Sequence, residues 1–362
     1  MPEVNTSIDK IQELTDDAII LLKNIIQVPS LSKEERHVAM LITHFLESKG
    51  IEVFQKGYNL WAITQNHSEN APTILLNSHH DTVKPSLGWD TDPFKPIEKE
   101  GKIIGLGSND AGASVVSLLA TFLYLNSLPS LPYKLIVAIT AEEEISGQNG
   151  IASILEDLGK IDLGIVGEPT GMNMAIAEKG LMVLDCTVYG RTGHAARNEG
   201  ENAIYKAMTD IEWFRNYKFE KESPVLGPIK MTVTQINAGT QHNVVPDLCS
   251  FVVDVRTTEC YTNAEIVEII QGKVGAEVKP RSTRLNASGI ALDHPIVQKG
   301  LKMGMEYYGS PTLSDQALMP FTTIKIGPGQ SARSHTPNEY IMIDEVREGI
   351  IKYIELLKGL EI

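Results

Sequence analysis

The chain has 362 residues, of which 42% are hydrophobic and 22% are charged, and its formal net charge is −14. Because this length exceeds what one typical core accommodates, we expect two domains. The negative charge argues against nucleic acid and anionic membrane surfaces as partners, since both require basic patches.

The cysteines and the apolar stretches indicate a cytoplasmic protein. Cys186, Cys249 and Cys260 lie far from any C-x-x-C spacing, and we expect them to be small apolar residues of a reduced protein. The polar, acidic stretch "MPEVNTSIDKIQELTDD" is unlike a signal or transit peptide. The longest apolar stretch, residues 113–128, is too short and too interrupted to span a bilayer, which predicts a buried helix.

The chain begins with two predicted helices, over residues 7–27 and 29–50. Ser7 begins the first helix, in which apolar residues recur at helical spacing. In the second helix, Ser32 and Glu35 are spaced as a capping box and Gly50 is a stop signal. Apolar strands then alternate with helices, and the strands are expected over residues 71–77, 133–140, 163–167 and 321–327. Such near-continuous apolar runs are typical of a mostly parallel sheet covered by helices.

Residues 173–288 follow a different pattern, in which strands and helices come in the order β-α-β-β-α-β. The strands are expected over residues 181–190, 228–239, 248–257 and 276–286, and the helices over residues 202–217 and 263–274. This order is that of a ferredoxin-like unit. We therefore predict an α/β domain of residues 1–172 and 289–362, interrupted by a ferredoxin-like α+β domain over residues 173–288.

Metal-ligand residue types follow every predicted strand of the larger domain. In open α/β sheets, sites form beyond the carboxyl ends of the strands. The residues found there are His79, His80, Asp81, Glu142, Glu143, Glu144, Glu168 and His335, and Asp110 follows the short stretch "GKIIGLGSN" just before the buried helix. Carboxylate and imidazole are ligands of zinc, and the lack of a cysteine cluster favours a catalytic site over a structural one. Asp110, Glu144, Glu168 and one hydroxide would balance the charge of two divalent ions.

Two other interpretations of these residues stay open. Single loop histidines and runs of acidic residues are most often solvated surface groups. The stretch "GLGSNDAG" before a helix also has the glycines of a phosphate loop. However, no long strand precedes this stretch, no G-K-[ST] follows it, and Asp110 would repel the phosphates.

The motifs "HHDTV", "GLGSNDAG", "AEEE", "GEPT" and "SHTPNEY", in this order over nearly the whole chain, resemble those of the M20 metallopeptidases. Within this family the sequence looks most similar to acetylornithine deacetylase and related N-acyl amino acid deacylases. The resemblance implies a zinc-peptidase-like catalytic domain, interrupted by a lid domain that also forms a dimer. It also implies two Zn²⁺ ions per subunit, for which Co²⁺ is a substitute.

The resemblance assigns roles residue by residue. His79 and Glu168 would bind one ion, Glu144 and His335 the other, and Asp110 would bridge both. Asp81 would orient His79, a supporting role that fixes the histidine tautomer. Glu143 would be the general base, which takes a proton from the attacking water and gives it to the leaving amine. Glu142 would be a supporting charge, and His80 receives no role. Many relatives carry Lys two residues after the bridging aspartate, where this chain has Gly112.

The smaller domain supplies further candidates by the same resemblance. His194, in "GRTGHAARNEG", would stabilise the oxyanion from the partner subunit of a homodimer, and Asn243 lies in the related stretch "QHNVVPD". A surface-loop histidine is the alternative for His194. Arg256 matches an arginine that relatives aim at a substrate carboxylate, with a strand-end salt bridge as the alternative. Lys179 is another candidate for substrate binding.

Arg333 lies two residues before His335, where acetylornithine deacetylases usually lack a basic residue. It could recognise a longer, acidic acyl group such as succinyl. The predicted function is zinc-dependent hydrolysis of an N-acyl amino acid, first of all N-acetylornithine in arginine biosynthesis. N-acetylcitrulline, N-succinylcitrulline, N-succinyldiaminopimelate and dipeptides stay open as substrates. A non-catalytic metal-binding relative is the alternative of a different class, and Glu143 argues against it.

Overall fold

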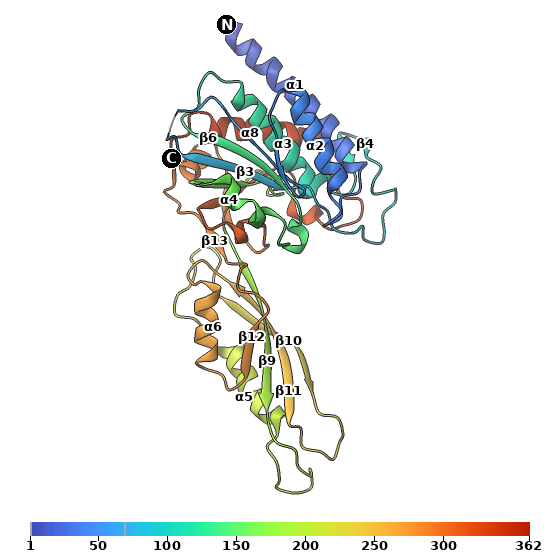
Figure 1. Ribbon diagram of the computed structural model, residues 1–362, viewed down its shortest axis with the longest axis vertical. Coiled ribbons are helices and arrows are strands. Elements are labelled where there is room, and N and C mark those ends of the chain that lie inside the picture. The colour runs from blue at the N-terminus through green and yellow to red at the C-terminus, as the bar shows by residue number, and fades with distance from the viewer. Residues whose placement is uncertain (1, 69) are drawn as a thin grey trace. The chain divides into compact units, whose positions relative to one another are not determined.

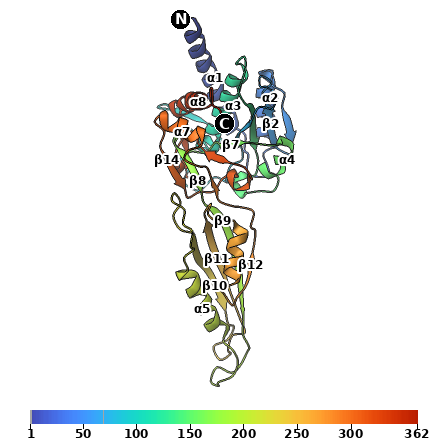
Figure 2. The same ribbon diagram turned by 90° about the vertical axis from the view of Figure 1, so that its left-hand side faces the viewer.

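The computed structural model describes residues 2–68 and 70–362, with side chains from residue 9 onward. The chain divides into two compact units, each visible in Figures 1 and 2. Unit 1 comprises Met1–Ile176, Ile290–Tyr308 and Ser314–Ile362, and unit 2 comprises Ala177–Gly289 and Gly309–Leu313.

A mixed sheet in the order β1-β2-β6-β3-β7-β15-β8-β13 has most of its strands in unit 1, with β14 paired to β8 and with the residues of β13 in unit 2. Its centre is parallel and consists of β6 (Lys134–Thr140), β3 (Thr73–His79), β7 (Leu163–Val166) and β15 (Thr323–Lys325). These central strands are almost entirely buried, as their apolar sequences predict.

The flanking strands make the sheet mixed. They are β1 (Phe54–Lys56), β2 (Asn59–Ile63), β8 (Met174–Glu178), β13 (Ser288–Gly289) and β14 (Tyr307–Ser310). β1 pairs with β2, β2 with β6, β8 with β15 and β13 with β8, all antiparallel. The two-residue turn between β1 and β2 permits only an antiparallel pair, and Gly57 in this turn has a φ of +61°.

Helices cover the sheet of unit 1, and α3 (Ala113–Asn126) lies against β3 and β6 (Figure 1). This helix also contacts α1 (Pro2–Ile26) and α8 (Ile343–Leu357), so it is buried almost all round, as its uniformly apolar sequence predicts. The remaining helices of unit 1 are α2 (Arg36–Ser48), α4 (Leu155–Leu158) and α7 (Pro295–Lys302). Among the described residues, no helix combines the length and apolar character needed to cross a membrane.

Both predicted starts of the N-terminal helices are wrong. α1 begins at Pro2 instead of Ser7, and proline is compatible with the first turn of a helix. α2 begins at Arg36, and its N-terminus has no side-chain cap. The Ser32 hydroxyl instead donates to Asp81 Oδ2 over 2.7 Å. The predicted end of the second helix is confirmed, since Gly50 lies just after α2 with a φ of +76°.

Unit 2 has the strand order β10-β11-β9-β12, with every neighbouring pair antiparallel. Its elements are β9 (Gly180–Tyr189), α5 (Ala203–Asn216), β10 (Lys230–Ala238), β11 (Leu248–Thr257), α6 (Asn263–Gln271) and β12 (Glu277–Pro280). This is the predicted β-α-β-β-α-β arrangement. Cys186 and Cys249 are free thiols and belong to its core.

The boundaries of unit 2 differ slightly from the predicted residues 173–288. β8 begins at Met174, and Ala175 pairs with Lys325 of β15, so the start of this strand belongs to the large sheet. A small antiparallel sheet of unit 1 has the order β16-β5-β4. Its strands are β4 (Ile97–Lys99), β5 (Lys102–Ile104) and β16 (Tyr340–Met342).

Candidate metal centre

The carboxyl ends of three neighbouring parallel strands carry predicted ligands. His79 is the last residue of β3, Glu144 lies in the turn η2 (Glu143–Ile145) after β6, and Glu168 follows β7. Because parallel strands end at the same edge of a sheet, these side chains are brought to one place. Asp110 comes from the turn η1 (Ser108–Gly112) before α3, and His335 follows the turn η5 (Ser331–Arg333).

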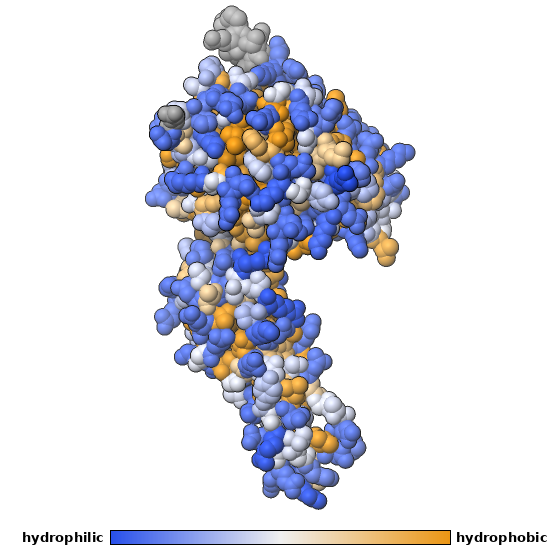
Figure 3. Space-filling model, in the orientation of Figure 1, coloured by the Kyte–Doolittle hydropathy of each residue, from blue (hydrophilic) through white to orange (hydrophobic). Residues whose placement is uncertain are grey.

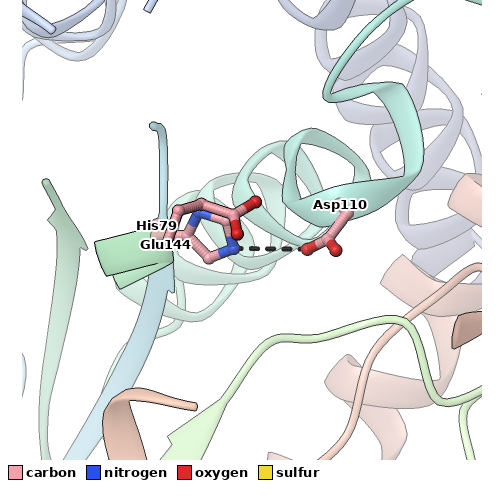
Figure 4. A group of neighbouring side chains, drawn as sticks. All are labelled: His79, Asp110 and Glu144. Carbon is pink, nitrogen blue, oxygen red and sulfur yellow. Dashed lines mark hydrogen bonds and ion pairs between the residues drawn. The ribbon is translucent and has the colours of Figure 1, made fainter. Parts of the chain in front are cut away.

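Asp110 lies between two histidines. Its Oδ1 is 3.3 Å from His79 Nε2, and its Oδ2 is 3.5 Å from His335 Nε2. His79 Nε2 is also 3.6 Å from Glu168 Oε1, and His335 Nε2 is 3.0 Å from Glu144 Oε2. Figure 4 shows His79 and Asp110 facing each other, with Glu144 beside His79. The structure thus brings the five predicted metal ligands together.

The spacing of these donor atoms fits bound cations. Ligand atoms of His79, Asp110 and Glu144 all lie within 4.8 Å of one another, and so do those of His79, Glu143 and Glu168. All donors are imidazole nitrogens or carboxylate oxygens, which suit zinc and other borderline or hard divalent ions. Since Asp110 directs one oxygen to each histidine, the chemistry and placement of the donors fit two ions that share this carboxylate.

Protons compensate the negative charge of this cluster when no cation is present. Burial raises the pKa of Glu143 well above its usual value and that of Glu168 to about 8. Burial opposes the charged form of His79, but the carboxylates of Glu143 and Asp110 outweigh it and raise the pKa of His79 well above its usual value. The hydrogen bond to Glu144 raises the pKa of His335 to about 9. A bound cation would have to displace these protons.

Asp81 organises both sides of the centre. Its backbone carbonyl oxygen is 2.9 Å and its Oδ1 3.4 Å from His79 Nδ1, so both can hold the imidazole. The Asp81 carboxylate also accepts the backbone N–H groups of Glu143, over 3.0 Å, and Glu144, over 3.2 Å. Burial opposes its ionisation, but hydrogen bonds from His79 and Ser32 hold the pKa of Asp81 below its usual value.

The three consecutive glutamates have separate environments. Glu142 is buried and has a φ of +57°, in the left-handed region that non-glycine residues rarely adopt. Its N–H donates to Glu35 Oε1 over 3.1 Å, and its carboxylate accepts from the Asn149 side chain over 2.9 Å. Glu142 is therefore engaged in supporting the turn, whereas Glu143 and Glu144 contact the histidines of the centre.

Sequence reasoning missed several supporting residues. The spacing of Ser32 and Glu35 predicts a helix cap, whereas in the structure both residues bind loops of the centre. Asp315 is buried, accepts from Thr140 Oγ1 over 2.8 Å and helps to raise the pKa of Glu143. Lys325 is buried at the end of β15, and its charge acts to lower the pKa of Glu168. The only sequence signal for these two was a charged residue close to an apolar stretch.

His80 is buried beside the centre and takes no visible part in it. Neither of its ring nitrogens has a hydrogen-bond partner within the described part of the chain. Burial lowers the pKa of His80 to about 4, so the ring is neutral at physiological pH.

Arg333 and Arg256 are engaged in salt bridges. Arg333 Nη1 and Nη2 donate to the Glu345 carboxylate over 2.6 and 3.1 Å, and the guanidinium lies 4.4 Å from the centre of the Tyr340 ring. These contacts bind both terminal nitrogens of Arg333 to Glu345, so the structure gives no support to the hypothesis that Arg333 recognises an acyl group. Arg256 Nε and Nη2 donate to Asp254 over 2.9 and 3.2 Å, which is the strand salt bridge considered as the alternative.

The remaining candidates, His194, Asn243 and Lys179, belong to unit 2, and their roles stay predictions. His194 is exposed, and its Nδ1 accepts the N–H of Ala196 over 3.1 Å. The N–H of Ala195 donates to the carbonyl oxygen of Asn243 over 3.0 Å. His194 and Asn243 therefore lie on two neighbouring loops of unit 2.

Comparison with known proteins relates this chain to one family of peptidases. A model described as peptidase family M20/M25/M40 matches residues 75–359. The succinyl-diaminopimelate desuccinylase of Buchnera aphidicola subsp. Acyrthosiphon pisum is 27% identical over 272 residues, which cover 69% of this chain and 72% of that protein. Aminopeptidase PepT from Bacillus cereus has a similar fold, with a TM-score of 0.74, 20% identity, and coverage of 95% of this chain and 98% of that chain. The YXEP protein of Bacillus subtilis, described as a dinuclear metal-binding peptidase of the M20 family, has a TM-score of 0.71, 16% identity, and coverage of 96% of this chain and 100% of that chain.

Proposed function

We propose that this chain, which belongs to peptidase family M20/M25/M40 and is a metal-dependent hydrolase, cleaves the linear amide of a small N-acyl amino acid with two zinc ions. The observation that carries the proposal is the position of Asp110, with one carboxylate oxygen toward His79 and the other toward His335. A shared carboxylate between two sets of imidazole and carboxylate donors supports a dinuclear site.

His79 and Glu168 would hold one ion, Glu144 and His335 the other, and Asp110 both. When bound, the ions would polarise a carbonyl oxygen and lower the pKa of water toward about 7. The mixture of imidazole and carboxylate donors supports zinc, with Co²⁺ as a proposed substitute.

Glu143 is the proposed general base. Its Oε2 lies 3.9 Å from His79 Nε2, at the edge of the proposed ligand set. Its buried environment raises the pKa of the carboxyl group, which favours a group that takes a proton and later returns it to the leaving amine. Asp81 would fix Glu143 and Glu144 in place, because its carboxylate accepts both of their backbone N–H groups.

N-acetylornithine is the substrate that we propose first, with ornithine and acetate as products. The second candidate is N-succinyldiaminopimelate, because the chain is similar to a succinyl-diaminopimelate desuccinylase over 69% of its length. With Arg333 paired to Glu345, recognition of either substrate would depend on other residues, and Lys179 and Arg256 remain proposed candidates.

We further propose a cytoplasmic homodimer formed through unit 2, in which His194 and Asn243 complete the site of the partner subunit. Free cysteines in the described chain are compatible with a reducing compartment. The net charge of −14, together with the largely hydrophilic face in Figure 3, favours small-molecule substrates over nucleic acid or a membrane as partners.

The test is amine release by the zinc-loaded chain and by Glu143→Gln. N-acetylornithine, N-acetylcitrulline, N-succinylcitrulline and N-succinyldiaminopimelate are compared side by side with a dipeptide. We expect hydrolysis of one of the acyl substrates, and a rate that is about 10²- to 10⁴-fold lower in the variant, with the zinc content unchanged. Hydrolysis of the dipeptide alone would replace the deacylase proposal with a peptidase. No hydrolysis by the zinc-loaded chain would favour a relative without catalysis.

A further inference from the structure

The carboxylate of Glu339 binds the turn that carries Asp110. Glu339 is 2% exposed, and its Oε1 accepts the backbone N–H groups of Asn109, over 2.8 Å, and Asp110, over 2.9 Å. Its Oε2 accepts the N–H of Gly107 over 3.2 Å. The backbone carbonyl of the same residue accepts the N–H of Gly105 over 3.0 Å. One residue near His335 thus binds four backbone N–H groups of residues 105–110.

The side chain of Asn109, which lies in the turn that carries Asp110, binds the loop that carries His335. Its Oδ1 accepts the N–H of Gln330 over 2.9 Å, and its Nδ2 donates to the carbonyl of Gln330 over 3.2 Å and to Ser334 Oγ over 3.3 Å. There is little free space here, since a Cβ atom on Gly329 would lie 2.3 Å from Asn109 Oδ1. The loops that present Asp110 and His335 are therefore held together by side chains of both.

We propose that Glu339 is a positioning residue, which fixes the Asp110 carboxylate opposite His335 so that the chain binds two metal ions tightly. The inference rests on the proposed metal centre. The orientation of the Asp110 backbone determines where its two oxygens lie, and Glu339 Oε1 holds that backbone directly by accepting the N–H of Asp110 over 2.9 Å. Loss of the acceptor would leave buried N–H groups without partners, and the turn would have to rearrange.

Glu339→Gln is the informative variant, because it preserves the size of the side chain. The amide offers one acceptor oxygen where the carboxylate offers two, so its NH₂ group would face either Gly107 N–H or the N–H groups of Asn109 and Asp110. We expect the affinity for at least one ion to fall about 10- to 100-fold, the usual effect of losing a group that orients a ligand. We expect kcat to fall by a similar factor, with KM nearly unchanged.

The control variant is Asn338→Ala. Asn338 Nδ2 donates to Asp90 Oδ2 over 2.7 Å, and its Oδ1 accepts the N–H of Asp90 over 2.9 Å. The control therefore loses two hydrogen bonds from the neighbouring residue without touching the Asp110 turn. It should retain the metal affinity and kcat of the unaltered chain.

The experiment uses the full chain, stripped of metal and titrated with Zn²⁺ by calorimetry and with Co²⁺ by visible absorption. Amide hydrogen exchange of residues 105–112 is measured in the metal-free proteins. In Glu339→Gln we expect weaker binding, an altered Co²⁺ spectrum and faster exchange in this segment. If circular dichroism shows that this variant does not fold, Glu339→Asp replaces it, with the same direction expected because the shorter side chain cannot reach both sides of the turn.

Wild-type metal affinity, spectrum and exchange in the variant would overturn the role of Glu339 and leave the metal centre intact. Equal losses in Asn338→Ala would also overturn it, because the effect would then be a general one on the loop. An unaltered chain that binds no ion would refute the proposed centre and, with it, this positioning role. Exchange would then show only whether Glu339 holds the turn.

Discussion

Asp81 shows how strongly this centre depends on one buried side chain. It contacts His79, a proposed metal ligand, accepts the N–H groups of two acidic residues and is itself held by the Ser32 hydroxyl. The resemblance to the M20 family suggested the contact with His79, but it did not reveal Ser32. Ser32 and Asp81 are separated by 49 residues, so local spacing could only suggest the nearer partner, a helix cap.

Replacement of Ser32 by alanine tests this support. The change leaves Asp81 Oδ2 without the hydroxyl donor at 2.7 Å, and we expect the free energy of unfolding to fall by about 1–3 kcal/mol. Urea unfolding of the metal-free chain measures the change. Ser48→Ala is the control, because the exposed Ser48 hydroxyl donates over the same 2.7 Å to the Phe45 carbonyl. Similar small losses in both variants would contradict the special role of Ser32.

Arg333 shows a case in which the structure changes the expected result of an experiment. Because the guanidinium is paired with Glu345 and stacked on Tyr340, Arg333→Ala should weaken the loop before His335 for every substrate. We expect kcat/KM to fall by the same factor for N-acetyl and N-succinyl substrates. Glu345→Gln should cause a similar loss that is also equal for both substrates. The loss of the charged pair should also lower the free energy of unfolding by about 1–2 kcal/mol. A selective loss on succinyl substrates would restore the acyl-recognition hypothesis.

At the scale of the elements, the parallel strands place the ligands and the turns orient them. The ends of β3, β6 and β7 were predicted closely, because buried strands have a clear apolar signature. The turn of residues 107–112 was harder to predict. A Cβ atom on Gly112 would lie 2.4 Å from the Gly107 carbonyl oxygen and 2.8 Å from Leu22 Cδ1, so this chain has no room for the lysine of many relatives.

Gly112→Ala should therefore weaken stability and metal binding, although Gly112 is not itself a proposed metal ligand. We expect a loss of about 1–3 kcal/mol in the free energy of unfolding, as for overpacking, and weaker metal binding because Asp110 moves with the turn. Thermal unfolding and Zn²⁺ titration measure the two effects. Gly272→Ala is the control, since a Cβ there would be 3.5 Å from its nearest neighbour. Wild-type stability in Gly112→Ala would show that the turn adapts.

For the whole molecule, the proton content of the metal-free centre predicts how stability depends on pH. The pKa of His335 is raised from 6.5 to about 9 by its hydrogen bond to Glu144, and that of Glu168 from 4.5 to about 8 by burial. Between the unfolded and the folded pKa of each of these two groups, the folded chain binds more protons than the unfolded chain. The free energy of unfolding therefore falls as the pH rises through these intervals. The contribution of His335 is complete below pH 6.5 and is lost as the pH passes about 9.

We expect the Tm of the metal-free chain to fall between pH 6.5 and pH 9, the range set by His335. Zn²⁺ displaces the same protons, so the increase in Tm on adding zinc should grow over this range. Scanning calorimetry with and without zinc measures both trends. His335→Gln is the control and should flatten the slope of the metal-free chain. A Tm that rises with pH in the metal-free chain would show that His335 and Glu168 do not determine how its stability depends on pH.

The proposed dimer leads to a further test. His194→Ala should lower turnover about 10²-fold with both ions retained, because an oxyanion donor is lost. His242→Ala, which removes an exposed histidine near Asn243, is the control and should leave the rate unchanged. If His194 acts across the dimer, mixing the impaired His194→Ala and Glu143→Gln chains should restore part of the activity. An unchanged rate in His194→Ala would remove this role, and failure of the mixture would confine it to one subunit.

The sequence by itself determined the two-part α/β and ferredoxin-like architecture and the chemical types of the proposed ligands. Both follow from local properties, since apolar periodicity marks the strands and parallel strands bring the residues after them to one edge. Only the tertiary structure decided which polar groups support the ligands. Ser32 with Asp81 and Glu339 with the Asp110 turn are hydrogen-bonded across 49 and 229 residues of chain. Such contacts depend on how loops pack, and the spacing of nearby residues cannot determine that packing.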